Sequence, residues 1–284
     1  DFNDLLDSPE SYSKYLTKAD VFVNAADPIF NKKILTLAIE FKTCYCDLAS
    51  EIDSEQTLKT MEFPQMHFNK QLKDRNLFGL INIGVSPGVT NFLVGEKLLN
   101  LQGRNQSLKI ISINLYLLEH IESEQIMFSW SPEIALDELE QKPRYIENKK
   151  LVSIEPFSQS KSYQFPHFKG LTTQFPIYQE EILSFQNSFP QIPFLKISTG
   201  GSEVELIKNL FQLNLLSKKH VECVAGNMSV EKIVRMVLPG LLTPKKIEGM
   251  LKAGAIKIAQ FAAMAEISLE VEGNTVIIVK GIDK

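Results

Sequence analysis

The fold is decided by the sequence INIGVSPGVTN, which occupies residues 81–91. An apolar run over residues 77–83 stops at Gly84, and a helical pattern begins after Pro87 and Gly88. This order predicts a strand, a tight turn and the start of a helix. In an open α/β sheet, ligands bind in the crevice outside the carboxyl ends of the strands. The turn is therefore a candidate floor for a binding site.

Strand-like and helix-like stretches alternate over the first hundred residues. We expect strands at residues 21–26, 43–48 and 77–83, and helices at residues 30–41, within 54–73 and at 89–101. Pro64 breaks or kinks the second of these helices. Such alternation implies βαβ units and a parallel sheet. The first domain, predicted over residues 1–106, is therefore a partial Rossmann-like parallel sheet of the α/β class.

A different pattern follows and predicts an α+β domain over residues 107–284. Ser131 is a good helix N-cap, with Pro132 at the first helical position and Glu133 near the positive end of the helix. The other elements expected here are strands at residues 108–119, 125–130, 151–154 and 194–197, helices at 203–216, 230–238 and 244–265, and a hairpin of strands 267–271 and 275–279.

Composition argues against several classes of protein. The chain has 284 residues, of which 44% are hydrophobic and 23% charged, values typical of a soluble globular protein. Its net charge of −4 and the lack of a basic stripe argue against nucleic-acid binding. No apolar run reaches the roughly 20 residues that span a bilayer, and no signal peptide is recognised. The three cysteines fit a reducing compartment, so we expect a cytoplasmic protein without membrane contact.

Small and polar residues follow the first two predicted strands. Asn24, Ala25 and Ala26 end the first strand, where small side chains let a ligand approach the backbone or let a helix pack on the sheet. Asp47 and Ser50 end the second strand in the same way. The Asp47 carboxylate could cap the next helix, support a ligand or be solvated. These residues are candidate ligand contacts, with packing or solvation as the alternative.

The turn that follows the third strand carries a more specific signal. Gly84, Gly88, the proline between them and Asn91 stand at the head of a helix, where backbone N–H groups can donate to an anion. A well-formed turn without a ligand is the alternative. Trp130, the sole tryptophan, lies beside the predicted cap Ser131. It is either a core residue or a side chain that faces a substrate.

Several catalytic signatures are missing from the sequence. The four histidines show no metal-ligand spacing, and no Gly-x-Ser-x-Gly elbow, phosphate loop or Cys-x-x-Cys motif occurs. Cys44 and Cys46 would point to opposite faces of a strand, so we expect neither a shared metal nor a disulfide between them. No metal site is predicted, and no residue is assigned as a catalytic acid or base.

Five short motifs follow one another along the chain. The first three are DVFVNAADP at residues 20–28, CYCDLASE at 44–51 and GVSPGVTN at 84–91. The last two are WSP at residues 130–132 and EILSFQNSFP at 181–190. In this order they resemble motifs of the saccharopine dehydrogenase family, which also contains carboxynorspermidine synthases. The family patterns are D-V-V-I-N-A-A, H-Y-V-D-x-S-x-E, G-x-D-P-G-V-T-N, W-S-P and E-x-x-T-L-x-x-S-F-P, and the resemblance covers nearly the whole chain.

The resemblance implies an NAD(P)-dependent oxidoreductase of amino-acid metabolism. Hydride would pass between the nicotinamide and the C–N bond of an amino-acid-derived secondary amine or imine. Residues 1–106 would be the remainder of the dinucleotide-binding domain. Residues 107–284 would bind the substrate and form a homodimer through their sheet.

The resemblance also implies which residues contact the ligands. NAD or NADP would lie against residues at the strand ends and in the turn, namely Asn24, Ala25, Ala26, Asp47, Ser50, Gly84, Val85, Pro87 and Gly88. The amino-acid-type substrate would lie against Ser86, Asn91, Trp130, Ser131 and Glu181.

Two departures from the family pattern bear on this expectation. Ser86 stands where the family usually has Asp, which removes a charge from the site. The family's Gly-x-Gly-x-x-Gly loop is missing, since Gly79 is the earliest glycine, and the chain begins at Asp1. We therefore interpret the chain as an internal fragment of a longer reductase that binds the cofactor weakly or not at all. The alternative is a non-catalytic relative that acts as a structural or dimerisation module.

Overall fold

The computed structural model describes residues 8–52, 54–104, 109–125, 127–128, 131–223, 226–238, 244–271 and 273–283. They belong to two compact units. The first unit comprises Asp1–Leu101 and Gln179–Phe189, and the second comprises Gln102–Tyr178 and Pro190–Lys284. The first division follows Leu101, whereas the sequence analysis places the boundary after residue 106. The return of Gln179–Phe189 to the first unit was not anticipated from the sequence.

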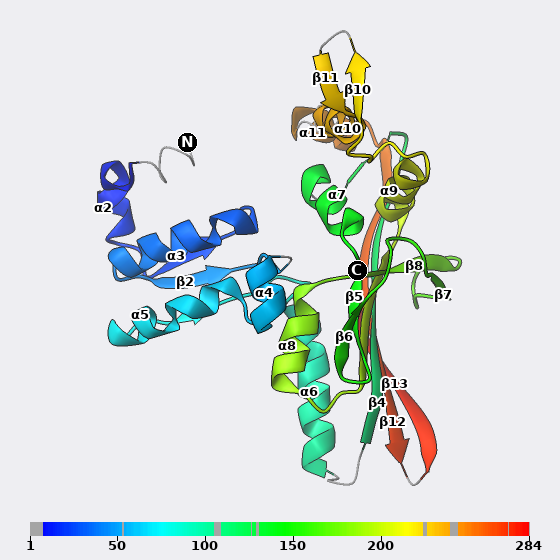
Figure 1. Cartoon of the computed structure of the whole chain (residues 1–284), viewed down its shortest axis with the longest axis horizontal. Coiled ribbons are helices and arrows are strands. Elements are labelled where there is room, and N and C mark those ends of the chain that lie inside the picture. Colours follow the sequence, from blue (N-terminus) through cyan, green and yellow to red (C-terminus); the bar gives the residue numbers. More distant parts are fainter. Residues whose placement is uncertain are drawn as a thin grey trace. The chain divides into compact units, whose positions relative to one another are not determined.

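The first unit contains a three-stranded parallel sheet (Figure 1). Its strands, in spatial order, are β1 (Val21–Asn24), β2 (Cys44–Asp47) and β3 (Gly79–Leu80). Its helices are η1 (Pro9–Tyr12), α2 (Ser13–Leu16), η2 (Pro28–Phe30), α3 (Asn31–Glu40), α4 (Glu55–Thr60), η3 (Pro64–Phe68), α5 (Asn69–Asp74), α6 (Val89–Arg104) and α8 (Glu180–Ser188). The parallel pairing confirms the predicted βαβ organisation.

Helix α3 covers one face of this sheet. Ile34, Leu35, Ala38 and Ile39 recur at helical spacing and are buried in one apolar cluster with Tyr45 of β2. Burial of this stripe is the main source of stability for such a short helix, because isolated helices of this length are marginal in water.

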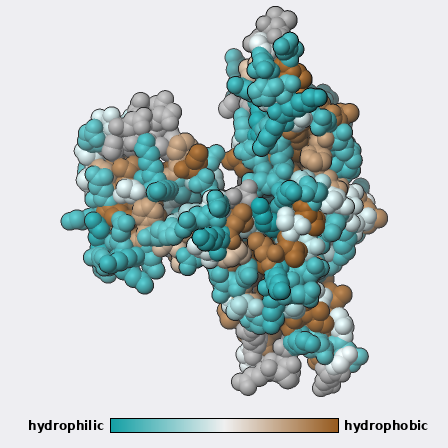
Figure 2. Space-filling model, viewed as in Figure 1, coloured by the Kyte–Doolittle hydropathy of each residue, from teal (hydrophilic) through white to brown (hydrophobic). Residues whose placement is uncertain are grey.

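The opposite face of the sheet is apolar, and its two outer strands are exposed there while Cys46 between them is buried. Side chains alternate along a strand, so the neighbours of the buried Tyr45 point the other way. Val23, Cys46 and Leu80 are in register on that face. Val23 is 58% exposed and Leu80 is 51% exposed. Exposed apolar residues of this kind appear as brown patches among the hydrophilic atoms in Figure 2.

Two of the predicted elements of the first unit are altered in the structure. The predicted helix within residues 54–73 is divided into α4, η3 and α5, with Pro64 opening η3 as a proline at the start of a helix does. The strand predicted over residues 77–83 contracts to β3. Asn82 has a φ of 59°, a left-handed conformation that cannot continue a strand.

The second unit is built on a mixed eight-stranded sheet, as expected of an α+β domain. Its strands are β4 (Lys109–Ser123), β5 (Arg144–Glu147), β6 (Lys150–Ser153), β7 (Lys161–Tyr163), β8 (Thr172–Ile177), β9 (Phe194–Gly200), β12 (Ile256–Val271) and β13 (Asn274–Asp283), with β10 (His220–Cys223) and β11 (Gly226–Ser229) in a separate hairpin. Its helices are α7 (Pro132–Glu140), α9 (Ser202–Gln212), α10 (Val230–Val237) and α11 (Pro244–Lys252). The main path runs β13-β12-β4-β9-β5-β6, with β4 and β9 parallel and the other pairs antiparallel.

The predicted helix over residues 244–265 is wrong in its second half. Helix α11 ends at Lys252, Gly254 adopts a φ of +68°, and β12 begins at Ile256. The alanines of this segment have high helix propensity. Strand β12 nevertheless pairs with β4 on one side and β13 on the other, and this tertiary pairing overrides the local preference.

Two other predictions for the second unit have clear outcomes. The strand predicted over residues 125–130 is wrong for Gln125, Met127 and Phe128, which lie outside regular structure; the rest of that stretch lies outside the described residues. The helix cap is confirmed, because Ser131 Oγ accepts a hydrogen bond from the Ile134 N–H at 3.5 Å. The predicted hairpin is also confirmed and extends to β12 and β13.

Candidate functional site

The turn between β3 and α6 is held by its own backbone. The Val89 N–H donates to the Gly84 carbonyl at 3.1 Å, and the Gly88 N–H donates to Asn91 Oδ1 at 2.9 Å. Gly88 has a φ of +127°, and a Cβ there would overlap the Gly84 carbonyl, so the turn requires glycine at this position. These two N–H groups are engaged within the turn and are not presented to an anion.

A buried polar network holds the segment that follows β3. Asp47 is completely buried, and its carboxylate accepts hydrogen bonds from the Asn82 N–H at 2.7 Å and from Gln65 Nε2 at 2.9 Å. Ser50 Oγ accepts from Gln65 Nε2 at 2.7 Å and donates to Asn82 Oδ1 at 2.6 Å. Burial raises the pKa of Asp47, and the hydrogen bonds from Asn82 and Gln65 oppose that rise. Asp47 and Ser50 therefore position Asn82.

A second network joins the ends of β1 and β2 to α3. Asn24 Nδ2 donates to Asn31 Oδ1 at 2.6 Å, and Asn24 Oδ1 accepts from the Ala26 N–H at 3.0 Å. The Tyr45 hydroxyl also donates to Asn31 Oδ1, at 3.0 Å, while Asn31 Nδ2 donates to the Ala49 carbonyl at 2.7 Å. Burial raises the pKa of the Tyr45 phenol, so Tyr45 remains a donor. Asn24 thus fixes the loop after β1.

Helix α8 is tied to the turn by a buried carboxyl group. Glu181 is completely buried, and its Oε1 accepts hydrogen bonds from Ser86 Oγ and Thr90 Oγ1, each at 2.6 Å. Ser86 Oγ also lies 3.2 Å from Oε1 of Gln179. Glu181 Oε2 has no hydrogen-bond partner among the residues that the structure describes. Burial raises the pKa of Glu181 against the lowering effect of the two hydroxyl groups, which favours its neutral form.

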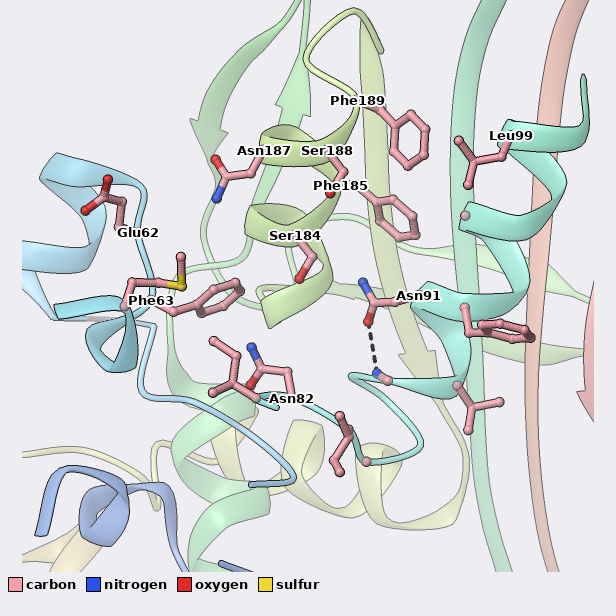
Figure 3. Close-up of a pocket in the computed structure, with 18 residues that line it drawn as sticks. Glu62, Phe63, Asn82, Asn91, Leu99, Ser184, Phe185, Asn187, Ser188 and Phe189 are labelled. Carbon is pink, nitrogen blue, oxygen red and sulfur yellow. Dashed lines mark hydrogen bonds between the residues drawn. The ribbon is translucent and has the colours of Figure 1, made fainter. Parts of the chain in front are cut away.

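A pocket of about 1060 Å³ lies beside the turn, within the first unit (Figure 3). Its wall is mostly apolar and is formed by residues of η3, the turn, α6 and α8. The lining residues are Glu62, Phe63, Met66, Ile81, Asn82, Ile83, Gly84, Gly88, Val89, Asn91, Phe92, Gly95, Leu99, Ser184, Phe185, Asn187, Ser188 and Phe189. Pockets of this size, apolar with a few polar groups, are typical of small-molecule sites.

The predicted ligand contacts are distributed unevenly around this pocket. Three of them line it, namely Gly84, Gly88 and Asn91. The others in the first unit do not line it: Asn24, Asp47, Ser50, Pro87 and Glu181 are buried, Ala25, Ala26 and Val85 are exposed, and Ser86 is half-buried. Ser131 caps α7 in the second unit. Trp130 lies outside the described residues.

Sequence reasoning missed four polar residues of the site. They are Asn31, Gln65, Asn82 and Ser184. Asn82 stands in the decisive stretch, and an asparagine that follows a strand and precedes a turn favours the left-handed conformation, so it could have been identified. The other three give no comparable local signal.

Among the residues that the structure describes, no cluster of three or more His, Cys, Asp or Glu side chains could hold a metal ion. Within that same part of the chain, no helix has both the length and the apolar character needed to cross a membrane.

The fold and the pocket define an α/β protein with a candidate ligand site at the carboxyl end of a parallel sheet. Residues 84–269 match the family model of the saccharopine dehydrogenase C-terminal domain, which covers most of the chain. The chain belongs to this family, and the resemblance read from the five motifs is confirmed.

The chain is also similar to two individual proteins. The chain is 26% identical over 174 residues to carboxyaminopropylagmatine dehydrogenase of Synechocystis, a match that covers 61% of this chain and 42% of that protein. The chain therefore spans less than half the length of this curated relative. A solved structure of saccharopine dehydrogenase (L-Glu forming) from Saccharomyces cerevisiae superposes with a TM-score of 0.66 and 15% identity, covering 98% of this chain and 74% of that one. At this identity the structural match establishes the fold.

Proposed function

We propose that the chain is part of an NAD(P)-dependent oxidoreductase that acts at the C–N bond of an amino-acid-derived secondary amine or imine. Family membership and the dehydrogenase names of its relatives support this proposal. The observation that carries it is the apolar pocket beside the turn after β3, at the sheet edge where such folds bind ligands.

The residues of this pocket fit the nicotinamide end of the cofactor. Gly95 of α6 lines the pocket, and a Cβ at that position would meet nothing within 4 Å, so the helix leaves space for a flat ring. Phe63 and Phe185 supply aromatic walls, and Asn82 and Asn91 supply polar groups. When bound, the reduced nicotinamide would supply a hydride to the imine carbon, while a proton reaches the nitrogen.

This chain's own residues would bind the nicotinamide ring and fix its orientation. The turn fixes the floor of the pocket, and Glu181 fixes the turn to α8 through Ser86 and Thr90. The aromatic side chains would exclude water from the ring, which is the protein's usual contribution in a hydride transfer. No residue is assigned as the proton donor.

The rest of the cofactor would need contacts beyond those described. The sequence has no Gly-x-Gly-x-x-Gly loop for the pyrophosphate. The exposed apolar face that carries Val23 and Leu80 is typical of a doubly wound sheet that lacks one helical layer. We expect further βα units of a longer gene product to cover this face and to hold the pyrophosphate.

The remaining expectations concern ligands and assembly. NAD and NADP are both possible cofactors, and the substrate would be of amino-acid type, as in a cytoplasmic enzyme of amino-acid metabolism. A homodimer through the second unit's sheet is supported by β13, the last strand of the main path, where Ile277 and Val279 are 60% and 52% exposed.

Cofactor titration tests the proposal. Nicotinamide fluorescence should change when the longer gene product is added to NADPH or NADH, with saturation at micromolar protein. The 284-residue chain alone should bind weakly or not at all. A longer product that leaves the fluorescence of both cofactors unchanged would refute the oxidoreductase proposal.

A non-catalytic structural or dimerisation module is the second candidate function. Ser86 favours it, because the family's usual aspartate would place a second carboxyl group at Glu181, and that charge is absent here. This candidate predicts a dimer in sedimentation without any cofactor binding by the longer product.

A further inference from the structure

The pocket beside the turn contains two amide groups whose nitrogen atoms have no hydrogen-bond partner among the described residues. They are Asn82 Nδ2 and Asn91 Nδ2, both of which are buried. Asn82 is 7% exposed as a whole. A buried donor without an acceptor destabilises the protein, so two such donors in one pocket call for an explanation.

The orientation of the Asn82 amide is fixed by its neighbours. Ser50 Oγ accepts a hydrogen bond from Gln65 Nε2, so its own proton is directed to Asn82 Oδ1 at 2.6 Å. The Asn82 backbone N–H is held by Asp47 at 2.7 Å. The network therefore occupies the oxygen and the backbone of Asn82 and leaves Nδ2 as its one unused donor.

The turn fixes Asn91 in the same manner. Asn91 Oδ1 accepts from the Gly88 N–H at 2.9 Å, which leaves Nδ2 unused. Figure 3 shows the Asn82 and Asn91 side chains pointing into the pocket on either side of Ser184. Residues from two parts of the unit thus present amide donors to one cavity.

We propose that this pocket selects an uncharged carbonyl or carboxamide oxygen carried on a flat aromatic ring, with Asn82 and Asn91 as its donors. Two donors without a partner match an acceptor. Glu62 is the one residue with a charged side chain among those that line the pocket, and none of the described lining residues is lysine or arginine. A carboxylate would therefore lose its hydration without gaining a counter-charge, whereas the two amide donors can replace the water that a neutral carboxamide oxygen loses. The walls of Phe63 and Phe185 suit an aromatic ring.

This inference rests on the proposed function in one respect, because the carboxamide of nicotinamide is such a group. It adds to that function the residues that donate hydrogen bonds to the carboxamide oxygen. It also predicts that the corresponding carboxylic acid binds more weakly.

Nuclear magnetic resonance of the 284-residue chain tests the inference. The side-chain NH2 signals of Asn82 and Asn91 are assigned in the 15N-labelled protein, with Asn82→Asp and Asn91→Asp to verify each assignment. Benzamide and nicotinamide should shift both pairs of signals in a saturable manner. Benzoate should bind at least about tenfold more weakly, the ratio expected when a polar group is left without its partner.

A matched variant at a helical glycine outside the pocket provides the control. Gly249→Leu in α11, where a Cβ also meets nothing within 4 Å, should leave the shifts intact, whereas Gly95→Leu should fill the pocket and abolish them. Neither variant meets a neighbouring atom at Cβ, so both should fold. Thermal unfolding followed by circular dichroism checks this point.

Three results would overturn the inference. They are NH2 signals that stay unmoved by benzamide, benzoate that binds as well as benzamide, and shifts that persist in Gly95→Leu. Failure of the proposed function has a different signature. Benzamide binding without cofactor binding by the longer product refutes the oxidoreductase and keeps the pocket, whereas cofactor binding with unmoved NH2 signals refutes the pocket assignment alone.

Discussion

The two units differ in the side chains that are buried at the centre of each sheet. In the first unit Asp47, Asn82 and Glu181 are buried at the carboxyl end of the sheet, while Val23 is exposed on its face. In the second unit the central strand β4 buries residues of both faces, Leu117 and Leu118 among them. The second unit therefore obtains its stability from apolar packing in its own sheet. The first unit also has an apolar cluster beneath α3, but beside its pocket it retains the amide nitrogens of Asn82 and Asn91 with unused hydrogen-bonding capacity, which is the pattern of a unit built to bind.

The largest predicted effect is a cavity in the second unit. Leu118 is completely buried between β4 and its neighbours, so Leu118→Ala should lower the free energy of unfolding by about 2–5 kcal/mol. Urea denaturation followed by circular dichroism measures this loss. A loss comparable to that of an exposed substitution would show that β4 is less tightly packed than described.

The next effect concerns the turn in the first unit. Gly88→Ala forces a side chain into a φ of +127° and against the Gly84 carbonyl, so it should lower the free energy of unfolding by about 1–3 kcal/mol or more. Gly95→Ala is the matched control, because that glycine lies in α6 with open space around it. It should stabilise the protein by about 0.5–1 kcal/mol through helix propensity. The two variants should therefore change urea stability in opposite directions.

The buried acid predicts a dependence of stability on pH. Because the pKa of Glu181 is raised in the folded state, its contribution is fully present below the pKa of an unfolded glutamic acid and is lost as pH rises through the folded pKa. Glu181→Gln is neutral at every pH and should stabilise the protein more at pH 8 than at pH 4. Thermal melts across this range measure the difference, with Glu51→Gln as an exposed control. A constant difference between Glu181→Gln and the native protein would show that the pKa of Glu181 is not raised by folding.

The smallest effect is expected on the exposed face of the first sheet. Val23 is 58% exposed, so Val23→Ser should change the free energy of unfolding of the 284-residue chain by no more than about 0.5 kcal/mol. The same substitution in the longer gene product should cost more if further βα units cover the face. Urea denaturation measures both effects. Equal small effects in the two proteins would contradict the expectation that further βα units cover this face.

Local signals in the sequence predicted the elements that depend on nearby residues. The alternation of strands and helices, the Ser131 cap and the hairpin between β12 and β13 all arise from short-range chemistry and are present in the structure. The second half of the helix predicted over residues 244–265 failed because pairing with β4, more than a hundred residues earlier, overrides alanine propensity.

The site was harder to predict from the sequence because its contacts join residues that are far apart along the chain. Glu181 meets Ser86 across 95 positions and Glu180 meets the Ser50 N–H across 130. Such contacts depend on the return of residues 179–189 to the first unit, which no spacing rule predicts. Glu181 was predicted from a motif as a substrate contact, and the structure places its carboxyl group on the turn. Asn82 is the residue that local chemistry could have identified.

The most direct test of the central claim is a map of where a nicotinamide ring binds. The 15N-labelled chain is titrated with reduced nicotinamide mononucleotide, which carries the ring without the adenosine that a missing glycine loop would hold. We expect backbone shifts concentrated at residues 82–95 and 184–189, and their loss in Gly95→Leu. Shifts centred in the second unit, or shifts that are unchanged in Gly95→Leu, would contradict this placement of the ring.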